Sequence, residues 1–259
     1  MAQVDEIVYV AVTPPDVLEA NLIKNVSAII NKDPYETRLL LTGSIPRIIA
    51  NYHNMQTAES IAQSLKDLGL VAIICKDSEL RKPSRSFRAH TLEFGESEVL
   101  FRDKGRGERR IRAGDVFLII KGSMQTYIET EATKTKTKFS LGATLLTGGI
   151  PIWRRVSEKT RDMALQAECF ARLYSRKSSE PIIEILQHHM NYSFLGSKTA
   201  PSSLANFNTV VTKLQEVFPQ AVFDDRLTKF SRTGLPPARV LDYHEANCKL
   251  IYLYHLATR

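Results

Sequence analysis

The chain has 259 residues, of which 43% are hydrophobic and 24% charged, and its formal net charge is +7. This composition is typical of a soluble globular protein, and the length allows one large domain or two smaller ones. The positive charge favours an anionic partner, such as nucleic acid, an anionic membrane surface or an acidic protein.

The cysteines and the N-terminal residues indicate the cellular location. Cys75, Cys169 and Cys248 are odd in number and far apart, which excludes a disulfide framework or a CxxC metal site. The first twelve residues lack the basic flank of a signal peptide, and no apolar stretch is long enough to span a membrane. The sequence therefore predicts a cytoplasmic, soluble protein.

The first strand and helix are predicted within residues 1–32. Residues 6–12 (EIVYVAV) are typical of a buried strand, and Thr13 is placed to cap a helix that starts at the following prolines. That helix ends near Lys32 and carries apolar residues every four positions, namely Leu18, Leu22, Val26 and Ile30.

Two short strands, a second helix and a last strand follow. Residues 37–43 and 45–52 predict strands joined at Thr42-Gly43-Ser44. Asn54 is placed to cap a helix, and Gly69 is placed at its left-handed end. One face of this helix holds Ala58, Ile61, Ala62, Leu65 and Leu68, and residues 71–75 (VAIIC) form the last strand. The order βαββαβ predicts a ferredoxin-like α+β domain over residues 1–80.

Residues 58–77 (AESIAQSLKDLGLVAIICKD) carry a resemblance to known domains. An alanine-rich helix closed by glycine and followed by a strand resembles the end of the C-terminal domain of the ribosomal stalk protein. It also resembles the related adaptor that delivers substrates to a bacterial protease. Those domains bind other proteins, so the resemblance implies a protein partner.

A linker and a second domain are predicted next. Residues 81–86 are rich in basic residues, proline and serine, as linkers are. Residues 87–122 alternate apolar and polar positions between turn sequences, which predicts a meander of antiparallel strands. Further strand-like runs lie at 169–175 and 181–192, and helices are predicted at 203–218 and 237–259. Residues 87–259 are therefore predicted to form an antiparallel β-rich, barrel-like domain with C-terminal helices.

The order of elements over residues 87–218 resembles a pleckstrin-homology-like barrel, in which one long helix closes several antiparallel strands. The segments FSLGATLLTGGIP and SLANF…FDDRL resemble an uncharacterised bacterial protein family. This second resemblance implies no activity.

One sequence pattern occurs twice, as LLLTGSIPRI at 39–48 and TLLTGGIPIW at 144–153. A phosphate-binding loop would need Lys-Ser/Thr after the second glycine, and Ile-Pro follows instead. We interpret both copies as a sharp turn in which Gly43, and Gly148-Gly149, adopt positive φ.

Three clusters are weak candidates for catalysis or metal binding. HEANC (244–248) resembles half of a metalloprotease pattern with Cys248 in place of the second histidine, and a buried cysteine beside a surface histidine is the favoured interpretation. His188-His189 point to different sides, and Asp224-Asp225-Arg226 most simply form a local cap and ion pair. No motif for a nucleophile or a dinucleotide is present, so we expect no cofactor, no metal and no catalytic residue, unless His188, Asp224, Asp225 and His244 converge.

Basic residues give the most concrete candidate site. Lys134, Lys136 and Lys138 alternate with threonine, so they share one face if the segment is extended. Arginine beside an aromatic ring is a pairing that binds phosphates and stacks on bases. The candidate anion-binding residues are Lys134, Lys136, Lys138, Trp153, Arg154, Arg155, Arg109 and Arg110. The competing interpretation is that lysines on a strand simply prevent edge-to-edge aggregation.

Three functional classes follow from these features. The first is a non-catalytic binding or regulatory protein that engages a protein or anionic partner. The second is a nucleic-acid-binding protein that uses the basic surface over residues 102–155. The third is a hydrolase whose site is assembled from distant histidines and aspartates.

Overall fold

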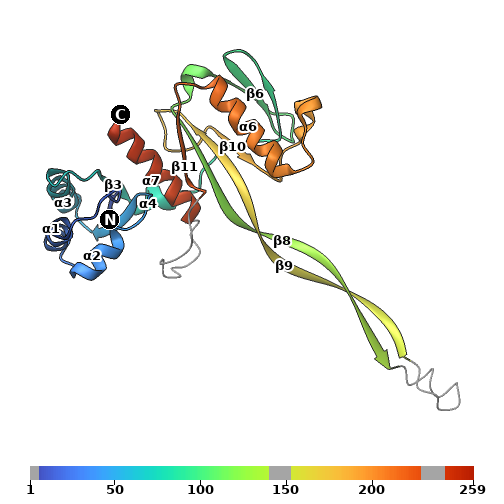
Figure 1. The fold of residues 1–259 in the computed structure, drawn as a ribbon, viewed down its shortest axis with the longest axis horizontal. Helices are drawn as coiled ribbons and strands as arrows, with labels where there is room; N and C mark the ends of the chain where they lie inside the picture. The colour runs from blue at the N-terminus through green and yellow to red at the C-terminus, as the bar shows by residue number, and fades with distance from the viewer. Residues whose placement is uncertain (1–5, 140–152, 229–242) are drawn as a thin grey trace, which may run out of the picture. The chain divides into compact units, whose positions relative to one another are not determined.

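The computed structural model describes the backbone of residues 6–139, 153–228 and 243–259, and the side chains of residues 6–124, 167–228 and 244–259 (Figure 1). The chain divides into two compact units, one formed by Met1–Ser123 with Cys169–Arg259 and the other by Met124–Glu168. The fold is mixed α+β. Each of the three sheets among the described residues is open, with two edge strands, so the barrel-like arrangement predicted for 87–259 is not seen there.

The first sheet is antiparallel and three-stranded, with β1 (Val8–Val12) between β2 (Arg47–Tyr52) and β3 (Ala72–Lys76). Alternate residues of β1 point to opposite faces, so Val8, Val10 and Val12 enter one core and Ala11 enters another. Helices α1 (Ala20–Ile30) and α3 (Met55–Asp67) supply the first core. The second core includes Leu80 of α4 (Asp77–Arg81) and Leu250 of α7 (Tyr243–Thr258).

Helix α1 begins later than predicted. Its N-cap is Glu19, and Thr13 instead continues the sheet by donating its backbone N–H to the Val71 carbonyl oxygen at 3.3 Å. The reason is local. Pro14 precedes Pro15, and a residue that precedes proline is disfavoured in helical geometry, so a helix that starts directly after Thr13 is disfavoured. The prediction that Thr13 caps this helix was wrong.

The segment predicted as a strand at 37–43 forms helix α2 (Pro34–Leu40) instead. Asp33 caps it, since its Oδ1 accepts from the backbone N–H groups of Tyr35 and Glu36 at 2.8 and 2.9 Å. Pro34 occupies the first turn, where its missing N–H is not needed. The helix-start signal at Asp33-Pro34 therefore outweighed the preference of the leucine run for a strand.

The signals around α3 are confirmed. Asn54 Oδ1 accepts from the Gln56 backbone N–H at 2.8 Å, and Ala58, Ala62 and Leu65 are buried on one face. Gly69 has φ +83°, and the Leu70 N–H donates to the Leu65 carbonyl oxygen across the helix end at 3.2 Å. Gly43 also has positive φ, at +124°, as predicted for the turn, whereas Gly148 and Gly149 lie outside the described residues.

The predicted meander is partly confirmed. β5 (Thr91–Phe94), β6 (Glu98–Arg102) and β7 (Glu108–Arg112) form an antiparallel sheet, and the short η1 helix (Ala113–Asp115) follows. The strands that precede and follow this meander in the sequence belong to a different, five-stranded sheet.

That five-stranded sheet has the order β11-β8-β9-β10-β4 and is mixed. β4 (Phe87–Ala89) runs parallel to β10 (Ile183–Leu186), and β11 (Val222–Leu227) runs parallel to β8 (Leu118–Phe139). β9 (Trp153–Tyr174) completes it. The antiparallel arrangement predicted for this domain is therefore confirmed only in part, because β4 and β11 pair in parallel with strands that are distant in sequence.

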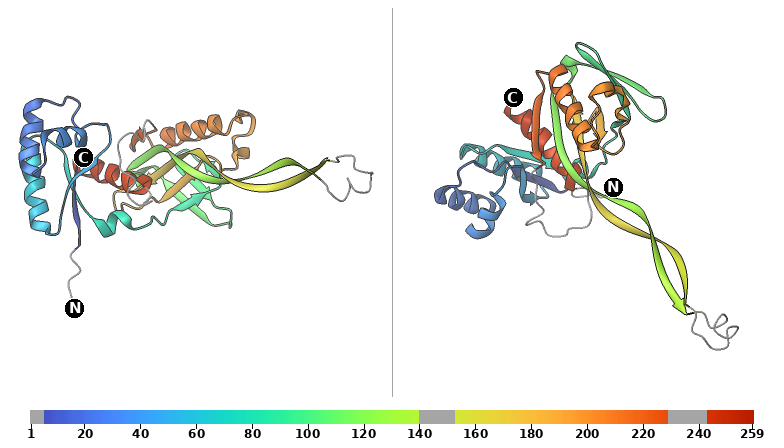
Figure 2. Two further views of the ribbon diagram at one scale, coloured as in Figure 1. Left: turned by 90° about the horizontal axis from the view of Figure 1, so that it is seen from below. Right: turned by 45° about the vertical axis from the view of Figure 1, so that its right-hand side comes forward.

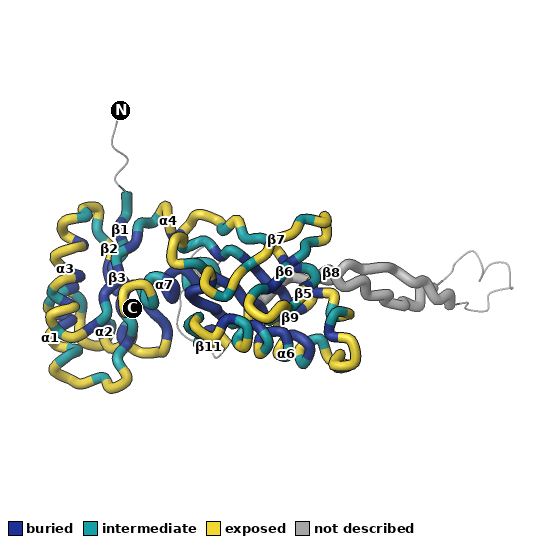
Figure 3. Tube along the Cα trace, turned by 90° about the horizontal axis from the view of Figure 1, so that it is seen from above, coloured by how far each residue is buried: buried dark blue, intermediate teal, exposed yellow. Residues whose placement is uncertain are grey.

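Helix α6 (Ser203–Val217) closes this part of the fold. Its predicted face is confirmed by Phe207, Val211 and Leu214, which are buried in a core that also includes residues of β5, β6 and β10, whereas Leu204 is 45% exposed. In Figure 3 the tube of α6 changes between buried and exposed colours along its length. The η2 helix (Tyr192–Lys198) precedes it. The final predicted helix corresponds to α7 over its described residues, and no helix in the described segments is long and apolar enough to cross a membrane.

Candidate functional site

The second compact unit is a two-stranded ribbon. Its described residues, 124–139 and 153–168, all belong to β8 and β9, which run in opposite directions and twist about each other (Figures 1 and 2). Lys134, Lys136 and Lys138 lie in β8, so the extended backbone required by the sequence prediction is confirmed. Trp153, Arg154 and Arg155 begin β9. The side chains of residues 125–166, which include all of these candidate residues, lie outside the described part of the chain.

Charge is unevenly distributed along this ribbon. Residues 132–161 contain seven lysines and arginines and one glutamate, a net charge of +6 out of +7 for the whole chain. Residues 124–131 and 162–168, at the other end of the ribbon, contain four acids and no lysine or arginine. Nearly all of the excess positive charge therefore falls within one segment.

Arg109 and Arg110 lie in β7, outside the ribbon unit. As neighbours on a strand, they point to opposite faces of the sheet. Arg109 donates to the Ile182 carbonyl oxygen at 3.1 Å and lies over the ring of Phe87, 5.2 Å from its centroid. Arg110 forms an ion pair with Glu98. The two arginines have separate local partners.

Asp224 is the most strongly held of the candidate catalytic acids. It lies in β11, is 4% exposed, and accepts from the Arg226 guanidinium at 2.6 Å and from His255 Nε2 of α7 at 2.8 Å. Burial alone would raise the pKa of Asp224, but the hydrogen bonds from His255 and Arg226 outweigh burial and hold it well below its usual range. The predicted local pairing of Arg226 is confirmed, and Asp225 is exposed.

The HEANC segment forms the start of α7. Cys248 is fully buried, as predicted, and burial raises the pKa of its thiol to about 12. The prediction that His244 lies at the surface was wrong. Its ring packs edge-on against Phe170 with centroids 3.9 Å apart, and its Nε2 is buried. No cluster of three metal-ligating side chains occurs among the described residues.

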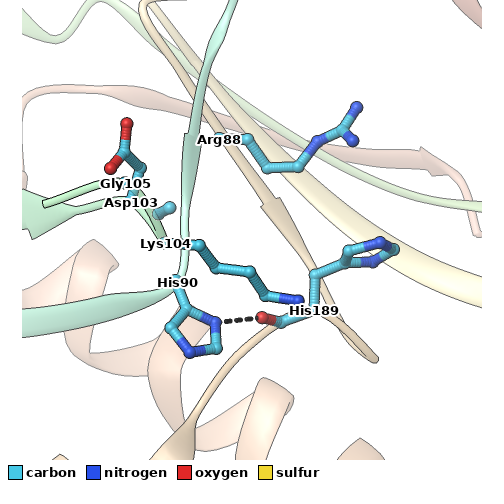
Figure 4. A pocket seen from close by; sticks show the side chains of 7 residues that line it. Arg88, His90, Asp103, Lys104, Gly105 and His189 are labelled. Carbon is cyan, nitrogen blue, oxygen red and sulfur yellow. Dashed lines mark hydrogen bonds between the residues drawn. The ribbon is translucent and has the colours of Figure 1, made fainter. Parts of the chain in front are cut away.

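An open surface pocket of about 300 Å³ lies where three segments of the chain meet (Figure 4). Arg88 and Ala89 come from β4, and His90 follows that strand. Residues 103–105 form the turn between β6 and β7, and His189 follows β10. Basic side chains predominate in the lining, in which Asp103 is the one acid.

Backbone hydrogen bonds hold these three segments together. The His90 N–H donates to the Arg102 carbonyl oxygen at 2.7 Å, and the Asn191 N–H donates to the His90 carbonyl oxygen at 2.8 Å. His90 Nδ1 lies 2.6 Å from the His189 carbonyl oxygen, which only accepts, so Nδ1 carries the hydrogen. Sequence reasoning missed this pocket, because no local pattern connects the segments.

Comparison of the chain with protein-family models, with curated proteins and with solved structures gave no match. Function is therefore inferred from the charge, contacts and geometry of the chain itself.

Proposed function

We propose that this chain is a non-catalytic binding protein that engages an anionic partner through residues 132–161 of the ribbon. The observation that supports this most is the concentration of net charge +6 within a segment whose described residues lie in β8 and β9. Every described residue of this unit belongs to β8 or β9, and two strands by themselves are only marginally stable, so a partner that packs on the ribbon would stabilise it.

The energetics of like charges support a partner over simple protection of strand edges. Seven cations crowded along two neighbouring strands repel one another, and this repulsion opposes folding unless anions neutralise it. Protection against edge pairing needs only a few charged residues on an edge strand, whereas seven lysines and arginines lie along these two strands. Four of the five acids in residues 124–168 lie apart from these cations, at 124–131 and 162–168.

A nucleic acid is the second candidate and the more specific one. The major groove of B-form DNA admits a two-stranded β-ribbon, and neutralising phosphates with lysine and arginine supplies most non-specific affinity. The form of the ribbon and its basic segment fit both requirements. Trp153, beside Arg154 and Arg155, adds an aromatic ring that stacks on an unpaired base.

An acidic protein is the alternative anionic partner. The resemblance of residues 58–77 to protein-binding domains supports it, as does the ability of ribbon edges to pair with another strand. A cytoplasmic location belongs to the same proposal, because Cys75, Cys169 and Cys248 are thiols that are not joined in a disulfide.

The proposal is tested by measuring fluorescence anisotropy of labelled duplex DNA, single-stranded DNA and an acidic polypeptide at low salt. The variant Lys134→Gln/Lys136→Gln/Lys138→Gln should bind at least about tenfold more weakly than the wild type, because three cations can no longer neutralise the partner. Exposed lysines outside the ribbon give a matched control that removes the same charge, Lys66→Gln/Lys177→Gln/Lys198→Gln.

Equal weakening by both triple variants would mean that only the total charge matters and would contradict a site on the ribbon. Binding of none of the three polyanions by the wild type would contradict the proposal as a whole. A preference for either DNA over the acidic polypeptide, which carries negative charge of another chemistry, would select the nucleic-acid form of the proposal.

A further inference from the structure

We propose that the pocket lined by Arg88, His90, Lys104 and His189 binds a single phosphate group, either inorganic phosphate or a small phosphate monoester. This site is separate in sequence and chemistry from the basic segment of the ribbon. The proposal rests on one observation: basic side chains from three chain segments line the same pocket (Figure 4).

The cations of the pocket differ in a way that suits a phosphate group. The Arg88 guanidinium offers a planar pair of donors that matches two phosphate oxygens, while the Lys104 ammonium is a compact charge on a flexible stem. In Figure 4, Lys104 points toward His189, and the ring of His189 lies on the same side as Arg88. A phosphate placed among these groups meets donors from several directions.

The one acid of the lining is engaged elsewhere. Asp103 Oδ1 accepts from the Gly107 backbone N–H at 2.8 Å, and the Asp103 N–H donates to the Gly107 carbonyl oxygen at 3.0 Å. Its carboxylate therefore closes the turn that presents Lys104, and in Figure 4 it points away from the basic side chains. The acid shapes the pocket and leaves its cationic side open to an anion.

The carboxylate that holds Arg88 is shared with a second arginine. Glu184 accepts from Arg88 at 3.1 Å and from Arg172 at 2.7 Å, and it is 3% exposed. The Arg88 side chain is 58% exposed, so much of it remains open to solvent. Glu184 thus orients Arg88 while leaving donors of its guanidinium for a ligand.

The pocket is assembled before any ligand binds. The His90–Arg102, Asn191–His90 and His90–His189 hydrogen bonds fix the three segments relative to one another. Because the backbone that carries the donors is already in place, binding orders only the side chains and loses less conformational entropy. At about 300 Å³ the pocket is at the small end of ligand sites, which favours a phosphate or a small monoester over a larger molecule.

The test is a calorimetric titration of the full chain with inorganic phosphate and, separately, with glycerol 3-phosphate, combined with amide chemical shifts recorded by NMR. We expect saturable binding of at least one of them, with shifts at Lys104, Gly105 and His90. Lys104→Ala should weaken it roughly tenfold or more, because the variant lacks a charged hydrogen-bond donor to the phosphate. Tighter binding of glycerol 3-phosphate identifies a monoester as the ligand, and tighter binding of phosphate identifies the free ion.

Two variants separate this site from other effects. Lys66→Ala removes an equal charge from an exposed position of α3 and should leave the affinity unchanged. Lys134→Gln/Lys136→Gln/Lys138→Gln should also bind phosphate like the wild type, which keeps the pocket distinct from the ribbon. Absence of saturable binding of both ligands, or equal affinity of Lys104→Ala and the wild type, would overturn the proposal.

Discussion

Four charged side chains connect the strands of the five-stranded sheet to the C-terminal helix. Arg88 of β4, Glu184 of β10 and Arg172 of β9 stand opposite one another in the strand register, and Arg172 also pairs with Glu245 of α7 at 2.5 Å. Arg172 and Glu184 are 6% and 3% exposed. Buried charges are tolerated when each is paired, so a slip of one residue in this register would leave them without partners.

Beside this chain of ion pairs, His244 is held neutral. Burial, and after it the charge of Arg172, lower the pKa of His244 to about 3. An unfolded histidine has a pKa of about 6.5, so the unfolded chain binds a proton in the window between these values and the folded chain does not. The stability contribution is therefore fully present above about pH 6.5 and is lost as the pH falls.

We predict that His244→Gln flattens the dependence of unfolding free energy on pH below about 6.5, where this histidine contributes at most about 1.4 kcal/mol per pH unit. Urea denaturation at a series of pH values measures this slope. His53→Gln, at an exposed position, is the matched control and should keep the wild-type slope. Identical slopes for the two variants would show that His244 titrates normally in the folded protein.

The left-handed conformation at the end of α3 gives a second prediction at this scale. Gly69 has φ +83° and no atom lies within 4 Å of an added Cβ, so the cost of Gly69→Ala comes from backbone conformation alone. We expect a decrease of about 1 kcal/mol in unfolding free energy. Gly114 is equally open but lacks positive φ, so Gly114→Ala should be neutral or slightly stabilising. A comparable decrease in both variants would contradict this explanation.

At the scale of elements, α7 packs against two parts of the larger unit. Leu250 enters the core that includes Ala11 and Ile73 of the first sheet. Tyr252 contacts Tyr174 of β9, with ring centroids 5.5 Å apart, and Lys249 donates to the Glu79 carbonyl oxygen at 2.9 Å. The helix therefore depends on residues far earlier in the chain.

Two leucines of α7 test this dependence. Leu250 is 3% exposed, so Leu250→Ala should lower the unfolding free energy by about 2–5 kcal/mol, because it removes buried apolar atoms and leaves a cavity. Leu256 is 42% exposed on the same helix, and Leu256→Ala should change it by less than about 0.5 kcal/mol. Thermal and urea unfolding measure both changes. A small effect of Leu250→Ala would mean that α7 is not anchored to the first sheet.

Local signals in the sequence predicted elements well where geometry is decided within a few residues. The Asn54 cap, the Gly69 turn and the buried face of α6 are of this kind. The parallel pairing of β4 with β10 joins segments that are far apart in the sequence, and no periodicity in the sequence indicates it. The helix start at Asp33-Pro34 was readable, but the run of leucines after it was given more weight.

The candidate sites also differ in whether a local pattern in the sequence could predict them. The lysines of β8 could be predicted to share a face because strict alternation of two residue types is typical of a strand. The pocket was missed because Arg88, Lys104 and His189 become neighbours only through strand pairing. Arg109 and Arg110 were grouped by proximity in sequence, although a strand places them on opposite faces.

For the molecule as a whole, charge is the property that distinguishes the ribbon unit. Outside residues 132–161 the chain has a net charge of only +1, so most of the net positive charge that attracts anions over long distances lies within that segment. A concentrated charge produces a directed field, whereas the same charge scattered over the surface does not. We expect encounter with a polyanion to begin at the ribbon.

The most direct test of this account is the salt dependence of duplex DNA binding, measured for the wild type and Lys134→Gln/Lys136→Gln/Lys138→Gln. The affinity of the wild type should fall linearly on a double-logarithmic plot. The slope of the triple variant should be shallower by about 0.9 for each phosphate that the variant no longer neutralises. An unchanged slope in the variant, or wild-type binding that does not respond to salt, would contradict the claim that the ribbon engages an anionic partner.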